Sequence, residues 1–161
     1  MTWYDVQDEA VLDGTPEQIV QALVDESQGR SSWWQPQMRM RQVGDLPITE
    51  VGGLIEFVVW SRVRLGRDRE TSRFTARVVG RDGGRELTLR VFDGDFRGVE
   101  SWTFDPVDDC HTRVALHWSM KPHGRIRLLA RFVDVGAAHS KVVQEGLGAV
   151  GAYVRGRRLA A

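Results

Sequence analysis

The sequence predicts an α+β fold in which a seven-stranded antiparallel sheet curves around one long C-terminal helix. Three observations predict it. Between residues 38 and 120, successive short segments alternate polar and apolar side chains, as half-buried strands do. Short turn-rich stretches separate these segments, and strands joined in this way pair as an antiparallel meander. From about residue 126 to 155, apolar residues instead recur at steps of three and four, the spacing of one helical face.

The arrangement of these elements predicts a concave space. A sheet of this kind has one face to bury, and the chain offers only one long helix to cover it. A single helix laid on a curved sheet leaves room between the two, and ligand sites are concave and mostly apolar. We therefore expect a barrel-like cup with a cavity between the sheet and the last helix.

The N-terminal part of the chain predicts a strand followed by a capped helix. Residues 4–12 alternate, with Asp8 as the polar member of the expected inner face. Thr15 is suited to the N-cap position, Pro16 to the first helical position, and Gln18 completes a capping box. The helix is expected to end near Glu26, and a further helical turn is expected before Pro36.

The remaining strands follow from alternation and from the turn residues between them. Glycine, proline and aspartate gather in the separating stretches, as they do in tight turns. The expected strands are residues 38–41, 54–64, 71–80, 86–92, 96–104 and 112–120.

Composition narrows the class of protein. The 161 residues fit one domain spanning 1–161. The charges of the 22 basic and 22 acidic side chains cancel, and this absence of a basic excess argues against a nucleic-acid partner. Cys110 is the single cysteine, so no intrachain disulfide can form. The first residues lack the pattern of a signal peptide, and no stretch approaches the roughly 20 apolar residues that span a bilayer. We expect a cytoplasmic protein without an integral membrane segment; its oligomeric state stays open.

Three local patterns, in their order along the chain, carry a resemblance to a known family. Residues 12–20 (LDGTPEQIV) resemble its opening strand and capped helix, and residues 33–36 (WWQP) resemble its tryptophan-rich segment. Residues 102–106 (WTFDP), followed by 112–114 (TRV), are similar to its sixth-to-seventh strand hairpin. The chain thus resembles the START/SRPBCC superfamily, with the helix-grip fold, and within it the polyketide cyclase/dehydrase-like group.

The resemblance implies two short helices between the first two strands and a deep cavity inside the sheet. Members bind lipids, sterols, polyketides or other apolar small molecules, and some catalyse cyclisation, dehydration or hydrolysis. The superfamily has no universal catalytic motif, so the resemblance assigns no catalytic residue to this chain.

Aromatic and methionine side chains are the candidates for ligand contact. Tryptophan offers a large apolar surface and one N–H donor, and methionine adapts to irregular shapes. The same residues would serve equally well as ordinary core. The candidate ligand-binding residues are Trp34, Met40, Trp60, Trp102 and Trp118.

Two glutamates are weak candidates for catalysis. Glu100 shares a predicted face with Trp102, and Glu56 lies in a strand that is apolar on both faces, so its orientation is open. A carboxyl group buried among apolar side chains has a raised pKa and can exchange protons near neutral pH. Asp8 is a third candidate on the same argument. The alternative for each is an ion pair with one of the many arginines.

No metal or cofactor site is predicted. Asp109, Cys110 and His111 carry metal-ligating groups, but they are consecutive residues in an expected hairpin turn, and a zinc site needs ligands that converge. No glycine-rich loop leads from a strand into a helix as a phosphate site requires.

Three functions remain open. The first is binding of an apolar or aromatic small molecule, lipid or polyketide-like, in the cavity. The second is a cyclase or dehydratase that uses a buried carboxylate. The third is a non-catalytic module that binds another protein, for which a closed cavity and a large exposed apolar patch would be the signature.

Overall fold

A computed structural model describes residues 3–62 and 68–161, with side chains for residues 3–60 and 70–161. Seven strands form one antiparallel sheet in the order β1-β7-β6-β5-β4-β3-β2, which confirms the predicted meander. The strands are β1 (Tyr4–Asp13), β2 (Met38–Val43), β3 (Leu54–Arg62), β4 (Asp68–Asp82), β5 (Glu86–Gly94), β6 (Phe96–Pro106) and β7 (His111–Pro122). The predicted third strand also included Val63 and Arg64, which lie outside the described residues.

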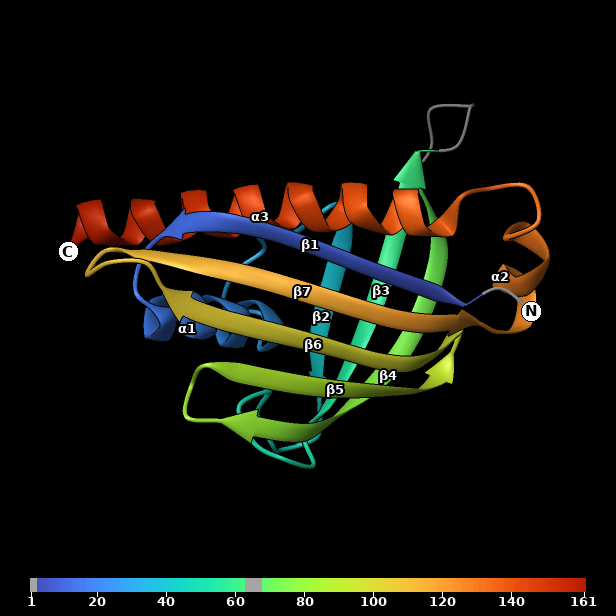
Figure 1. Cartoon of the computed structure of the whole chain (residues 1–161), viewed down its shortest axis with the longest axis horizontal. Coiled ribbons are helices and arrows are strands. Elements are labelled where there is room, and N and C mark those ends of the chain that lie inside the picture. The colour runs from blue at the N-terminus through green and yellow to red at the C-terminus, as the bar shows by residue number, and fades with distance from the viewer. Residues whose placement is uncertain (1–2, 63–67) are drawn as a thin grey trace.

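The sheet curls around α3 (Val135–Ala160), so the predicted α+β fold is confirmed. Figure 1 shows α3 running along β1, while β2, β3 and β4 pass behind at a steep angle and close the rear of the cup. The helix buries one stripe against the sheet, formed by residues four, three and four apart: Val143, Leu147, Val150 and Val154. Neither this helix nor the other two, within the described residues, combines the length and apolarity needed to cross a membrane.

The first helix, α1 (Pro16–Ser27), begins as the sequence predicts. Thr15 Oγ1 accepts a hydrogen bond from the Gln18 amide at 3.3 Å, and Gln18 Oε1 accepts one from the Thr15 amide at 3.0 Å. This reciprocal capping box is a local interaction, so it could be identified from sequence alone.

The expectation of two short helices between the first two strands fits only in part, because α1 is the one helix in this stretch. Residues 28–37 form bends and turns, and Gly29 has a φ of +72°. The buried carboxylate of Glu26 accepts hydrogen bonds from Ser31 Oγ at 3.0 Å and from the Trp33 amide at 2.9 Å. Because a side chain satisfies these donors, the segment folds into turns that place Trp33 and Trp34 without a helix.

The predicted C-terminal helix is divided in two. A short helix, α2 (Gly124–Leu129), precedes a turn, and α3 begins after Asp134. The Asp134 carboxylate accepts a hydrogen bond from the Ala137 amide at 3.0 Å, an N-cap that fixes the start of α3. The apolar spacing runs on through this turn, which is why periodicity alone predicts one helix.

Candidate ligand-binding cavity

The cup contains a cavity of about 590 Å³ between the sheet and the N-terminal half of α3. Its walls come from the strands β2, β3, β4, β6 and β7, from the turn before β2, from α2 and from α3. The apolar wall includes Val59, Phe74, Phe96, Trp118, Ile126 and Val135. A concave site of this size with aliphatic and aromatic walls is the usual form of a small-molecule pocket.

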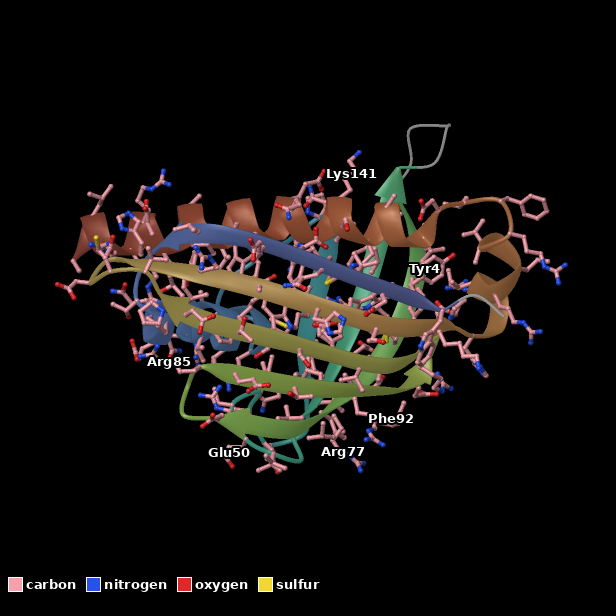
Figure 2. All side chains as sticks on the ribbon, viewed as in Figure 1. Tyr4, Glu50, Arg77, Arg85, Phe92 and Lys141 are labelled. Carbon is pink, nitrogen blue, oxygen red and sulfur yellow. The ribbon has the colours of Figure 1, made fainter. Side chains whose placement is uncertain are left out.

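The charged residues of the cavity lie at its mouth. Lys141 and Glu145, one helical turn apart on α3, line the opening and are exposed to solvent. Figure 2 shows Lys141 extending outward from α3, on the opposite side of the molecule from Phe92 and Arg77. Leu129 and Val133, before the start of α3, are 44% and 43% exposed and complete an apolar rim.

Among the residues that line the cavity, three have a buried polar atom without a partner. Ser72 of β4 and Trp118 of β7 are only 6% and 1% exposed, and His139 projects from α3. Ser72 Oγ, Trp118 Nε1 and His139 Nδ1 are buried and have no hydrogen-bond partner among the described residues. Buried polar atoms in native proteins nearly always have a partner, so these three require an explanation.

His139 is held as a neutral imidazole. Its ring stacks on Trp118 with centroids 4.0 Å apart and planes 14° from parallel. Burial lowers the pKa of His139 to about 4, and the nearby negative charge of Asp8 only partly opposes this shift. At neutral pH the ring therefore offers one donor nitrogen and one acceptor nitrogen.

Of the five predicted ligand-contact residues, the structure places Trp60 and Trp118 at the cavity. Trp60 is half-buried, and the Arg39 guanidinium lies 5.5 Å from its ring centroid. Trp34, Met40 and Trp102 are buried in the core but do not line the cavity.

Trp34 joins the core to the helix. Its indole Nε1 donates a hydrogen bond to the Val142 carbonyl of α3 at 3.1 Å, and its ring lies edge-on to Trp102 at 6.2 Å. A Cβ on Gly146 would lie 2.4 Å from the Trp34 ring, so only glycine allows α3 to approach this closely.

Glu100 lies inside the cup, on the face that alternation predicts. It is 4% exposed, and its Oε1 accepts a hydrogen bond from Trp102 Nε1 at 2.6 Å. Burial raises the pKa of Glu100 to about 7, against the smaller lowering effect of that hydrogen bond. Glu100 faces Trp118 across the β6–β7 pair but is not part of the cavity lining.

The carboxylates of Glu56 and Asp8 both have partners within the protein. Glu56 faces outward and forms ion pairs with Arg41 at 3.1 Å and Arg73 at 3.0 Å, the alternative that the sequence left open. Asp8 faces inward and accepts hydrogen bonds from Ser140 Oγ at 3.0 Å and Gln144 Nε2 at 3.1 Å, which ties β1 to α3.

The hairpin between β6 and β7 brings potential metal ligands together. The ligating atoms of Asp108, Cys110 and His111 lie within 4.8 Å of one another. The Asp108 carboxylate accepts hydrogen bonds from the Cys110 amide at 2.9 Å and from His111 Nδ1 at 2.8 Å. These hydrogen bonds within the turn explain the cluster.

Sequence reasoning missed Ser72 and His139 as cavity residues. A signal for His139 was present, because it occupies the series Val135, His139, Val143 and Leu147, in which the other members are buried and apolar. A histidine at an inward position of a helical stripe indicates a polar requirement on that face.

No protein-family model matches the sequence, and no curated protein matches it. Solved structures are similar in fold. The protein TTHA0849 from Thermus thermophilus has a TM-score of 0.70 at 19% identity, over 96% of this chain and 99% of that one. The Zhui aromatase/cyclase from Streptomyces sp. R1128 has a TM-score of 0.70 at 13% identity, over 97% and 96%. Major latex-like protein 151 from Panax ginseng has a TM-score of 0.63 at 9% identity, over 94% and 97%. The chain therefore has the helix-grip fold, the fold of the START/SRPBCC superfamily.

Proposed function

We propose that the protein binds an apolar or aromatic small molecule, lipid or polyketide-like, in the cavity between the sheet and α3. The observation that carries the proposal is the 590 Å³ cavity, whose walls are mainly aliphatic and aromatic and whose charged residues lie at the mouth. Such a surface favours transfer of an apolar molecule out of water. The fold shared with an aromatase/cyclase supports the proposal at the level of architecture.

A fluorescent apolar dye tests this proposal directly. We expect 1-N-phenylnaphthylamine to bind with saturation at one site and to quench tryptophan emission. Val142→Trp places a large side chain in the cavity wall, and we expect it to weaken dye binding by about tenfold or more. Val79→Trp on the exposed outer side of β4 is the matched control. Absence of saturable binding, or equal binding by both variants, would contradict the proposal.

A cyclase or dehydratase is the second candidate, and Glu100 is the observation that favours it. With a pKa near 7, this carboxyl group can donate or accept a proton at neutral pH. Its position outside the cavity lining weakens the case, because a general acid must reach the proton that it transfers. Native mass spectrometry of freshly purified protein would identify a bound species, and incubation with Glu100→Gln would show whether its turnover needs the carboxyl group.

The third candidate, a protein-interaction module, has less support. Its signature is a closed cavity together with a large exposed apolar patch. The residues at the mouth of the cavity are exposed, so the first condition is not met, whereas Leu128, Leu129, Phe132 and Val133 do form an exposed apolar stretch before α3.

A further inference from the structure

The stretch of chain that joins β7 to α3 exposes apolar side chains to solvent. Four of its apolar residues are exposed, namely Leu128, Leu129, Phe132 and Val133, and Phe132 is the most exposed at 82%. The amides of residues 130–133 each donate to a carbonyl three or four residues earlier, at 2.8 to 3.2 Å, so the four side chains lie on one compact turn. Single exposed apolar residues are common, whereas a group of them marks an interaction surface.

The same stretch carries an excess of positive charge. Residues 121–133 (KPHGRIRLLARFV) contain four lysine and arginine residues and no aspartate or glutamate, in a chain whose net charge is zero. Arg125 is partly neutralised by two acidic side chains, at 3.7 Å and 4.0 Å. Arg127 and Arg131 are exposed and form no ion pair within the part of the chain whose side chains the structure describes. Their charges are therefore available to a partner.

A tryptophan joins this surface from the N-terminal end of the chain. The exposed ring of Trp3 lies beside Lys121, whose Nζ is 5.9 Å from the ring centroid. Figure 1 shows the N-terminus and α2 at the same end of the molecule, opposite the C-terminus. Tryptophan is favoured at the boundary between hydrocarbon and water, because its ring is apolar and its N–H is polar. Residues 121–133 and Trp3 together are called the basic–apolar surface below.

The composition of the basic–apolar surface fits an anionic lipid bilayer. Basic and apolar side chains that alternate on one turn bind such a bilayer, because the arginines meet lipid phosphates while the apolar groups enter the acyl boundary. A projecting ring such as that of Phe132 needs a fitted pocket on a protein partner but none in a fluid bilayer. A second copy of the chain fits less well, since a symmetric contact would bring the unpaired arginines of both copies together.

The basic–apolar surface is continuous with the mouth of the cavity. Leu129 and Val133 belong to both, because they are exposed and also line the cavity. The buried Ile126 of α2 lines the cavity from the same segment, and the exposed Lys141 lies at the opening. A bilayer that covers this surface would lie against the opening, so an apolar molecule would pass between bilayer and cavity with little exposure to water.

We propose that the basic–apolar surface docks the protein on an anionic lipid bilayer, with the mouth of the cavity toward the membrane. Arg127 and Arg131 contact lipid phosphates, and Phe132 enters the acyl boundary beside Leu128. The inference goes beyond the proposed function, and it is tested separately because docking requires no ligand in the cavity.

Flotation with vesicles of two compositions tests the inference. We expect the wild-type protein to bind vesicles of equal parts phosphatidylcholine and phosphatidylglycerol about tenfold or more tightly than vesicles of phosphatidylcholine alone. High salt should remove most of this preference, because ions screen exposed charges.

The double variant Arg127→Gln/Arg131→Gln removes the two unpaired charges. We expect it to weaken binding to the anionic vesicles by about tenfold or more, since each basic side chain near such a surface contributes about fivefold. Arg85→Gln/Arg113→Gln is the matched control, because both arginines are exposed and Figure 2 shows Arg85 toward the opposite end of the molecule from α2. The control should stay within about twofold of wild type.

Phe132→Ser tests the apolar part of the surface. Loss of the inserted ring should weaken vesicle binding by about fivefold or more at either salt concentration. Leu159→Ser is the matched control, because Leu159 is 84% exposed but lies at the other end of α3. All of these substitutions are at exposed positions, and circular dichroism checks that each variant folds.

The outcomes separate docking from ligand binding. Failure to bind either kind of vesicle would overturn the docking and leave dye binding in the cavity untouched. Equal binding to both compositions, or an equal loss in the control variants, would also overturn it. Self-association of the wild type that Phe132→Ser abolishes, without vesicle binding, would show that the surface joins two copies instead.

Discussion

Glu100 is buried and His139 is half-buried, and the protein surroundings shift the pKa values of both side chains. Burial raises the pKa of Glu100 from 4.5 to about 7 and lowers the pKa of His139 from 6.5 to about 4. Between about pH 4.5 and 6.5, the folded protein therefore binds more protons than the unfolded chain at Glu100 and fewer at His139. Their effects on the pH dependence of stability oppose each other across this window.

Glu100→Gln should expose the effect of His139. The stabilisation from protonated Glu100 is complete below pH 4.5 and is lost as the pH rises to about 7. Glutamine does not ionise, so the variant should gain stability relative to wild type as the pH rises. The difference in the free energy of unfolding between variant and wild type should be up to about 3 kcal/mol larger at pH 8 than at pH 4.5. The glutamine oxygen still accepts from Trp102. Urea unfolding of both proteins at several pH values measures this difference, and a difference independent of pH would contradict it.

His139→Phe should have the opposite profile. The stability that depends on neutral His139 is complete above pH 6.5 and is lost as the pH falls to about 4. The variant should therefore gain stability relative to wild type as the solution is acidified. The same urea series measures it. A difference in the free energy of unfolding between variant and wild type that is the same at every pH would show that His139 ionises freely in the folded state.

Glu56 has apolar neighbours in the sequence, as a buried residue would, but its side chain faces the surface. Glu56→Gln breaks ion pairs to Arg41 and Arg73, whose side chains are 56% and 46% exposed. Exposed pairs contribute little, so we expect a loss of less than about 1 kcal/mol in the free energy of unfolding and no change in dye affinity. Thermal unfolding and dye titration check this, and a large loss of affinity would place Glu56 in the binding machinery.

At the scale of elements, the sequence predicted those features that local chemistry decides. The capping box at Thr15 and the alternation of β4 to β7 involve neighbours along the chain, and both are observed. The turn after α1 depends on Glu26 reaching Ser31 and Trp33, which only the folded chain reveals.

The cavity wall was only partly predictable for a similar reason. Trp118 follows from alternation, but the depth of Trp34 and Trp102 behind the wall depends on how closely α3 approaches the sheet. Glu56 stayed ambiguous because β3 buries apolar residues on both faces, with Phe57 inside and Val58 outside.

Gly146 sets the distance between α3 and the core. Gly146→Ala would place a Cβ 2.4 Å from the Trp34 ring, and we expect it to destabilise the protein by about 1–3 kcal/mol through overpacking. Gly148→Ala is the matched control, because nothing lies within 4 Å of its added Cβ. That control should be stabilising by up to about 1 kcal/mol, since alanine favours helix. Urea unfolding measures both, and equal effects would contradict a steric role for Gly146.

At the scale of the whole molecule, α3 has two differently supported ends. Its C-terminal end is anchored by the buried Asp25, which accepts a hydrogen bond from Tyr153 Oη at 3.1 Å and pairs with Arg157. Its N-terminal half spans the cavity and is tied to the sheet through Asp8. Stability and binding therefore depend on different parts of one helix.

Asp25→Asn should separate the two properties. It removes the negative charge that accepts from Arg30, Arg157 and Tyr153, while the arginines left behind are exposed, so we expect the free energy of unfolding to fall by about 1–3 kcal/mol. The cavity lies at the other end of α3, so the dye dissociation constant should stay within about twofold of wild type. Chemical unfolding and dye titration measure the two effects, and a parallel loss of affinity would show that the two ends are coupled.

The hollow beneath the first turns of α3 has a consequence for redesign. Three residues of the cavity wall are Ser72, Val59 and Ala138. Their side chains form no hydrogen bond or ion pair within the described chain. They can therefore be substituted without altering the interactions of Asp25 that hold the C-terminal end of α3. A library restricted to such wall positions can be screened for new guest molecules without rebuilding the scaffold. The chain thus offers a receptor whose selectivity can be rewritten one wall residue at a time.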